Sequence, residues 1–311
     1  MNDVNNKDTV MFFMQKFRDK ISEQEIWWLL EKVTGASKTL LLTDPLFTLT
    51  EEQIAKLILW VKLRTEENKP LQYILESVPF CGLDIYVEPP VLIPRPETEE
   101  WTTWVIQSLE NKEFLTPLCR TQAVVTRNNM KFNVLDMCCG SGCIGLAIAR
   151  AFPEIFVTGA DVSELALSCA HKNKERNNIT NITFIQSDVY QNIPDDYTCN
   201  IIIANPPYLA INEYDTLARD VREWEDYQAL IAGPTGLELY ARILAGAKKI
   251  LRPWGDAQTW DGLQELPSLI FEIGYKQDQQ IQELLHAYGY KKYELKKDSY
   301  GAWRFVVIYL A

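Results

Sequence analysis

The spacing of apolar residues separates a helical N-terminal part from a longer part in which strands and helices alternate. Between residues 54 and 61, apolar side chains recur at the i, i+3, i+4, i+7 positions of one helix face. Two capping-box patterns stand before apolar runs in this part, Ser22 with Glu25 and Thr50 with Gln53, and each predicts a helix start. The first ~95 residues are therefore predicted to be mostly helical.

From residue 132 onward, short apolar runs of strand type alternate with amphipathic helical segments. This alternation predicts an α/β domain with a doubly wound, mostly parallel sheet. Strands are expected at 132–136, 156–161, 183–186, 200–204, 269–273 and 305–309. Helices are expected at 142–151, 164–177, 237–251 and 278–287, and irregular loops at 119–129 and 254–267.

Residues 78–93 join the two parts and carry prolines and a glycine around short apolar runs, which predicts a β-hairpin or an extended linker. Pro94-Arg95-Pro96 is stiff because each proline disfavours the α conformation of the preceding residue. A helix is expected to follow at 97–107. The predicted organisation is a helical domain at 1–76, a hairpin linker at 77–95 and an α/β domain at 96–311.

Composition narrows the choice of partners. The chain of 311 residues has a formal net charge of -11, and no basic stripe for nucleic-acid phosphates is visible. We therefore expect no direct binding of DNA or RNA, whereas a basic protein partner would be attracted by such a surface. No apolar run reaches the length of a membrane span and the first residues lack a leader pattern, so a cytoplasmic protein that does not bind membranes is expected.

Cysteine usage argues against a metal centre. The chain has 7 cysteines and 2 histidines, and no C-x-x-C pair. We interpret the cysteines as small buried thiols in a reducing compartment, and predict neither a zinc site nor a disulfide framework.

Three acidic residues follow consecutive predicted strands: Asp136, Asp161 and Asp188. The first begins a turn with Gly140 and Gly142, where glycines let the backbone approach a ligand and the next helix offers free N–H groups. Because the carboxyl ends of parallel strands share one edge, the three acids are expected to form an adenosine site. There the second acid would accept from ribose hydroxyls and the third from an adenine amino group, while Val189 packs on the ring. Each acid alone could instead be an ordinary helix cap.

Two cofactors compete for this site. Residues 140–145 match the G-x-G-x-x-G pattern of dinucleotide sites, which would favour NAD. Asp136 and a later Asn-Pro-Pro-Tyr turn have no role in hydride transfer, whereas an acid here suits the cationic S-adenosylmethionine. We therefore expect S-adenosylmethionine as the cofactor.

The turn Asn205-Pro206-Pro207-Tyr208 follows the apolar run 201–204. Its two prolines fix φ and remove two backbone N–H donors, which leaves an amide side chain, bare carbonyl acceptors and an aromatic ring. These groups can hold a planar nitrogen that still carries hydrogens. The alternative is a turn that ends a strand and buries a tyrosine in the core.

Together, Asp136-x-x-x-Gly-Ser-Gly142, Asp161 and Asn-Pro-Pro-Tyr resemble class I S-adenosylmethionine-dependent methyltransferases that act on a planar nitrogen. Further segments narrow the resemblance to the HemK/PrmC family, whose members methylate N5 of the glutamine in the Gly-Gly-Gln motif of peptide chain release factors. These segments are Pro70-Leu-Gln-Tyr-Ile74, Leu92-Ile-Pro-Arg-Pro-Glu-Thr-Glu99, Asp220-Val-Arg222, Phe271-Glu-Ile-Gly274 and Gly301-x-x-Arg304.

The resemblance implies a seven-stranded class I sheet, a monomer, class I release factors as substrates, and an N-terminal domain that holds the body of the release factor. It puts the cofactor on Asp136, Cys138, Cys139, Gly140, Ser141, Gly142, Asp161, Asp188, Val189 and Asn205. It puts the glutamine on Asn205, Pro206, Pro207 and Tyr208, with Asn205, Pro206 and Tyr208 as the catalytic groups. Arg95 is expected among the substrate-binding residues, through an active-site or interdomain contact, and the alternative is a salt bridge with Glu97 or Glu99.

The chain departs from the family pattern at three places, one of which is the stretch 254–267, longer than the family's usual tight hairpin. Cys138-Cys139 stands where the family usually has Gly-Thr, and Glu225-Asp226 is displaced from the position of the family's Glu-Pro. Three other functions remain open: a methyltransferase acting on adenine or guanine of nucleic acid, a non-catalytic binding module, and an NAD-dependent reductase.

Overall fold

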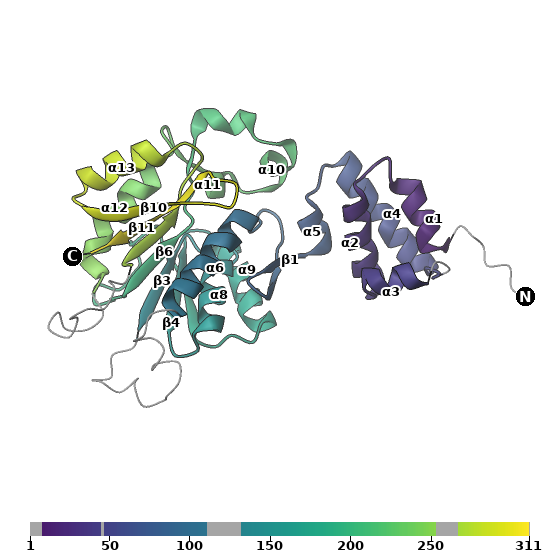
Figure 1. Cartoon of the computed structure of the whole chain (residues 1–311), viewed down its shortest axis with the longest axis horizontal. Coiled ribbons are helices and arrows are strands. Elements are labelled where there is room, and N and C mark those ends of the chain that lie inside the picture. Colours follow the sequence, from purple (N-terminus) through teal and green to yellow (C-terminus); the bar gives the residue numbers. More distant parts are fainter. Residues whose placement is uncertain (1–7, 45–46, 111–131, 253–266, 311) are drawn as a thin grey trace, which may run out of the picture. The chain divides into compact units, whose positions relative to one another are not determined.

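A computed structural model describes residues 8–44, 47–110, 132–252 and 267–310. Within it the chain forms two compact units (Figure 1). One consists of Met1–Ser77 with Ala218–Trp224, and the other of Val78–Leu217 with Glu225–Ala311. The loop predicted at 119–129, and residues 254–266 of the other predicted loop, lie outside the described residues. No helix in the described ranges is long and apolar enough to span a membrane.

The first unit is helical, as its apolar spacing predicted. Both predicted capping boxes are present: Ser22 with Glu25 begins α2, and Thr50 with Gln53 begins α4. Apolar side chains of all five N-terminal helices pack into one core. The helices are α1 (Val10–Phe17), α2 (Glu23–Thr34), α3 (Lys38–Thr43), α4 (Glu51–Glu66) and α5 (Leu71–Leu75).

A short helix from much later in the chain, α10 (Arg219–Trp224), belongs to this first unit. Asp220 forms an ion pair with Arg64 of α4 at 3.8 Å, and Trp224 Nε1 donates to the Glu67 carbonyl at 3.1 Å. The chain thus leaves the α/β unit after Leu217 and returns to it at Glu225.

The second unit is built on the predicted seven-stranded, mostly parallel sheet, and its strand order is β10-β11-β9-β6-β3-β4-β5. The five strands from β9 to β5 run parallel, so their carboxyl ends lie at one edge. Strand β11 runs antiparallel to both of its neighbours, β9 and β10. The strands are β3 (Asn133–Met137), β4 (Phe156–Asp161), β5 (Ile182–Gln186), β6 (Ile201–Ala204), β9 (Leu269–Glu272), β10 (Lys292–Lys297) and β11 (Trp303–Tyr309).

Strand β10 is the one strand of this sheet that the periodicity did not locate. Its side chains are all exposed or half-buried, and three of them are lysines, at 292, 296 and 297. As the edge of the sheet it needs no continuous apolar face, and charged side chains are usual on such strands. Its apolar pattern is therefore weak although its pairing with β11 is regular as far as Lys296.

Helices cover both faces of the sheet (Figure 1). The helices α12 and α13 pack on Leu135, Ile202 and Phe271 of the central strands, and α6, α8 and α9 lie on the other face. Their bounds are α6 (Pro96–Glu110), α8 (Cys143–Ala151), α9 (Glu164–Arg176), α12 (Glu238–Ile250) and α13 (Asp278–Ala287). Smaller elements are the hairpin strands β1 (Ser77–Phe80) and β2 (Leu83–Tyr86), the pair β7 (Leu209–Ala210) and β8 (Ile231–Gly233), η3 (Ile211–Thr216) and α11 (Tyr227–Leu230).

Candidate functional site

A cavity opens at the carboxyl edge of the sheet, where the ends of β3, β4, β5 and β6 meet. Its remaining walls come from residues 90–92, residues 226–229 and α12. Seven of the residues predicted as site residues line it: Cys138, Gly140, Asp161, Asp188, Val189, Asn205 and Pro207. Open parallel sheets commonly bind ligands at this edge.

The turn between β3 and α8 has an unusual backbone. Cys138, Gly140 and Gly142 all have positive φ, at 59°, 56° and 79°. Glycine adopts this region freely, whereas an L-residue such as cysteine does so at a cost. Cys139 and Ser141, also predicted to contact the cofactor, are buried and do not line the cavity.

Asp161 joins this turn to the next one. Its Oδ2 accepts from the Gly140 N–H at 2.8 Å, and its Oδ1 accepts from the Ser163 N–H at 2.9 Å. Burial raises the pKa of the Asp161 carboxyl, and hydrogen bonds from backbone N–H groups oppose that rise. The carboxylate thus fixes the wall of the cavity and still presents oxygen lone pairs to it.

Asp136 lies behind the turn and does not line the cavity. It is fully buried, and its Oδ2 accepts from the Gly145 N–H at 2.8 Å. Its Oδ1 has no hydrogen-bond partner among the described residues. Burial raises the pKa of Asp136 to about 7, the Gly145 N–H opposes the rise, and Asp161 adds to it. A buried carboxyl group with one oxygen that has no hydrogen-bond partner among the described residues is suited to balance a cation in the cavity.

The third acid, Asp188, forms an ion pair with Arg242 of α12 at 2.8 Å, and both side chains are about half-exposed. Its neighbour Val189 is buried at φ 56°, which is rare for a β-branched residue. Strained backbone of this type gathers at ligand sites. Arg242 was not foreseen, because no sequence pattern links α12 to the end of β5.

The Asn-Pro-Pro-Tyr turn follows β6 directly. Asn205 and Pro207 line the cavity, Pro206 is buried, and Tyr208 is half-buried. The Asn205 Nδ2 donates to Thr98 Oγ1 of α6 at 3.2 Å, and the Tyr208 carbonyl accepts from Gln277 Nε2 at 2.8 Å. Both ends of the turn are therefore held by distant side chains.

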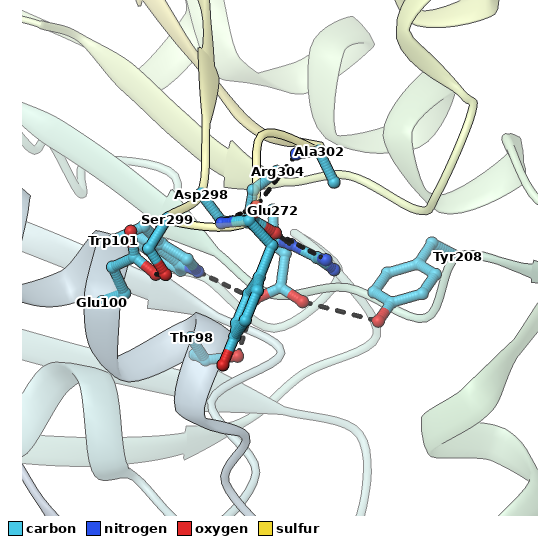
Figure 2. A network of polar contacts seen from close by, with 10 residues as sticks. Thr98, Glu100, Trp101, Tyr208, Glu272, Asp298, Ser299, Ala302 and Arg304 are labelled. Atoms are coloured by element: carbon cyan, nitrogen blue, oxygen red, sulfur yellow. Dashed lines mark hydrogen bonds and ion pairs between the residues drawn. The ribbon is translucent and has the colours of Figure 1, made fainter.

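Beneath the turn lies Glu272, the last residue of β9, and Figure 2 shows the side chains that converge on it. Its Oε2 accepts from Thr98 Oγ1 at 2.6 Å and from Trp101 Nε1 at 2.8 Å, while its Oε1 accepts from the Tyr208 hydroxyl at 3.4 Å. Arg304, held by Asp298 at 2.9 Å, contributes positive charge nearby.

The roles of Thr98, Trp101 and Glu272 were missed from the sequence. Thr98 and Glu272 stood in the segments that carried the family resemblance, but without an assigned contact. A glutamate at the end of the otherwise apolar run 269–271 was the available signal, because a buried carboxylate requires donors.

One interpretation of Arg95 was a salt bridge with Glu97 or Glu99, but the arginine pairs with another residue. Its guanidinium contacts Glu225 at 2.6 Å, and the Glu225 side chain is only 1% exposed. The other interpretation, an active-site or interdomain contact that includes substrate binding, stays a prediction. Glu225 is the first residue after the chain returns from the helical unit, so the ion pair holds this return point beside the start of α6.

Sequence comparison places this architecture among known proteins. The family profile of the PrmC N-terminal domain matches residues 13–75, and that of the methyltransferase small domain matches residues 121–221. The release factor glutamine methyltransferase of Flavobacterium psychrophilum is 33% identical over 94% of this chain and 93% of its own length. The chain belongs to the release factor glutamine methyltransferase family.

Other members of the family show similar relationships. The protein of the same name from Streptococcus pneumoniae is 33% identical over 87% of each chain, and that from Chlamydia trachomatis serovar D is 34% identical over 76% of this chain and 71% of its own. The resemblance drawn from the sequence motifs is thereby confirmed.

A solved structure shares the fold. The hMettl16 catalytic domain, in a structure titled as a complex with MAT2A 3'UTR hairpin 6, has a TM-score of 0.50 over 84% of this chain and 82% of its own. Its sequence identity is 16%, so the likeness concerns the fold alone.

Proposed function

We propose that this protein transfers a methyl group from S-adenosylmethionine to the N5 side-chain amide of the glutamine in the Gly-Gly-Gln motif of class I release factors. The observation that carries the proposal is the position of Asn205. Its side chain lines the cavity beside the three acid-bearing strand ends, while Thr98 and the network of Glu272 hold it from behind. The names of the relatives supply the substrate class.

The cavity suits S-adenosylmethionine on three grounds. Its wall includes Asp161, whose carboxylate can accept from ribose hydroxyls, and the Asp188–Val189 corner, which can receive an adenine. Behind it, Asp136 has a buried oxygen without a hydrogen-bond partner among the described residues. The cofactor supplies, when bound, an electrophilic methyl group on a sulfonium. Asp136 and Asp161 balance its positive charge, since Asp188 is already paired with Arg242.

The substrate groups follow from the turn itself. A glutamine amide nitrogen is a weak nucleophile because its lone pair is delocalised into the carbonyl. We infer that Asn205 Oδ1 and the Pro206 carbonyl each accept one of its N–H groups, which aims the lone pair at the methyl and favours the charge that develops on nitrogen. Tyr208 stacks on the planar amide, and its hydroxyl bond to Glu272 fixes the tilt of its ring.

The reaction needs no strong general base. Once methylated, the amide nitrogen is cationic and loses its proton readily to water. Holding the reacting atoms within about 3–3.5 Å of each other supplies much of the acceleration. Residues 1–76 are proposed to bind the body of the release factor, in a cytoplasmic, monomeric enzyme.

A transfer assay with tritiated S-adenosylmethionine tests the proposal. Purified release factor, ribosomal RNA and duplex DNA are offered separately to the enzyme. We expect label in release factor alone. Label in either nucleic acid, with none in release factor, would instead support the nucleic-acid methyltransferase considered from the sequence.

A further inference from the structure

The amide of Asn205 has two chemically different ends, and only one suits the proposed reaction. An oxygen toward the cavity accepts an N–H of the substrate, whereas an NH₂ group there would repel it. The orientation of this amide therefore decides whether the site can work. The side chains behind Asn205 determine that orientation through their own donors and acceptors.

The direction of each hydrogen bond can be followed from Trp101 outward. An indole N–H can only donate, so Glu272 Oε2 accepts at 2.8 Å. The same oxygen receives the Thr98 hydroxyl proton at 2.6 Å. With its single proton committed, Thr98 Oγ1 has only lone pairs left for Asn205. The Asn205 NH₂ group must then face Thr98, and it does so at 3.2 Å.

The opposite end of the amide is left for a ligand. No hydrogen bond to Asn205 Oδ1 is formed by the residues that the structure describes, and Asn205 lines the cavity. Thr98, Trp101 and Glu272 are each 1% exposed, so water does not compete for these donors and acceptors. A rotation of the Asn205 amide by half a turn would place its oxygen against the Thr98 lone pairs.

We propose that Thr98 and Glu272 are positioning residues that lock the Asn205 amide with Oδ1 toward the substrate. This rests on the proposed function, since it assigns Asn205 Oδ1 the task of accepting the glutamine N–H. Neither residue touches the reacting atoms. The same carboxylate also holds the Tyr208 hydroxyl, so Glu272 orients both the hydrogen-bonding and the stacking surfaces of the substrate site.

Burial and the surrounding hydrogen bonds act on the pKa of Glu272 in opposite directions. Burial raises the pKa of Glu272, and the hydrogen bonds from Thr98 and Trp101 together with the Arg304 guanidinium oppose that rise. The Nε and Nη2 atoms of Arg304 in turn both donate to Asp298 Oδ2. Two segments that are far apart in the sequence, around Thr98 and Arg304, thus meet at the side chain of Glu272 (Figure 2).

The test replaces the Thr98 hydroxyl and keeps its shape. Thr98→Val removes the acceptor, and Thr98→Ser restores it. Thr102→Val is the matched control, because Thr102 is a fully buried threonine one turn along α6 whose hydroxyl donates to the Thr98 carbonyl. For each variant we would measure kcat and KM with a release-factor domain, the Kd of S-adenosylmethionine by calorimetry, and the melting temperature.

We expect Thr98→Val to lower kcat by roughly 10- to 100-fold, since the substrate loses an oriented acceptor that acts on the developing charge. KM should change by less than about threefold, because residues 1–76 are proposed to bind the body of the release factor. The cofactor Kd should change by less than about threefold, because the acids that face the cofactor are untouched. Thr98→Ser should return kcat to within about threefold of the unsubstituted enzyme. If Thr98→Val fails to fold, Thr98→Ala removes the same acceptor without placing a methyl group where the hydroxyl was.

Equal loss of kcat in Thr98→Val and Thr102→Val, or wild-type kcat in Thr98→Val, would overturn the proposal. A second readout does not depend on turnover. In NMR spectra, the signals of the Asn205 side-chain NH₂ group can be identified by their loss in Asn205→Ala. They should shift in Thr98→Val and stay in place in Thr102→Val. If the unsubstituted enzyme methylates no release factor, the proposed function fails, while unshifted NH₂ signals in Thr98→Val would refute the lock separately.

Discussion

The two halves of the site are held in different ways. In the half formed by β3 and β4, the acids are fixed by backbone N–H groups of the turns that follow these two strands, as when Asp161 accepts from Gly140 and Ser163. In the half formed by β6, Asn205 and Tyr208 depend on side chains of α6 and β9, far away in the sequence. A short motif can encode the first half almost alone, whereas the second requires a buried network.

This contrast predicts that substitutions should separate cofactor binding from turnover. A group of the β6 half should affect kcat and leave cofactor affinity intact. A group of the β3 and β4 half should affect cofactor affinity and leave saturated turnover nearly intact. The following predictions test that separation in order of decreasing effect.

Replacement of Asn205 by alanine should have the largest effect. It removes the oxygen proposed to accept the glutamine N–H, and we expect kcat to fall by about 1000-fold or more, as for other groups that act only on the developing charge. The Kd of S-adenosylmethionine should stay within a few-fold when measured by calorimetry. Retained turnover would remove Asn205 from the catalytic groups.

Replacement of Asp161 by asparagine should show the opposite pattern. The amide can accept only at its oxygen, so one of the two backbone N–H groups loses its partner and the charge is lost. We expect the Kd of S-adenosylmethionine to rise by roughly 10- to 100-fold, as when a hydrogen bond to a charged group is removed. Asp195→Asn, an exposed acid that does not line the cavity, is the charge-matched control.

In that experiment kcat at saturating cofactor should remain within about fivefold of the unsubstituted enzyme. A large loss of kcat in Asp161→Asn without any loss of affinity would break the proposed division between the two halves.

Asp136 should make the stability of the cofactor-free protein depend on pH. Burial raises the pKa of this carboxyl to about 7 from its ordinary 3.8, so the folded protein holds the proton more tightly than the unfolded chain. Its favourable contribution is therefore complete at acidic pH and is lost as the pH rises toward and through 7. Between about pH 5 and pH 6, the free energy of unfolding should fall by up to about 1.4 kcal/mol per pH unit more in the unsubstituted protein than in Asp136→Asn, and by about half as much per unit near pH 7.

Urea denaturation of the two proteins across this pH range measures the difference. Two curves with the same dependence on pH would mean that Asp136 is already ionised in the folded protein, and would contradict the raised pKa that its burial implies.

The smallest effect concerns Cys138, whose φ of 59° is unfavourable for an L-residue. Glycine at this position should raise the free energy of unfolding by about 0.5–1 kcal/mol, because it adopts this backbone freely. Cys139→Gly, at a neighbouring buried residue without positive φ, should lower it. Thermal unfolding of the two variants decides this, and a destabilised Cys138→Gly would show that thiol packing outweighs the backbone strain.

The sequence was sufficient where local patterns determine the structure. The sheet, the helices on it and the cavity-lining positions of Asp161, Asp188 and Asn205 follow from apolar runs and from the shared edge of parallel strands. It was insufficient where distant segments meet. No pattern in the chain identifies the partners of Glu272 or the partner of Arg95, because these residues are brought together only by folding. The edge strand β10 was missed because its exposed lysines conceal the apolar alternation.

The most direct test of the proposed function is tandem mass spectrometry of a class I release factor after incubation with this enzyme and S-adenosylmethionine. We predict one added methyl group on the glutamine of the Gly-Gly-Gln peptide, and none when Asn205→Ala replaces the enzyme. An unmodified peptide in the presence of the active, cofactor-bound enzyme, or a methyl group on a different residue, would contradict the account.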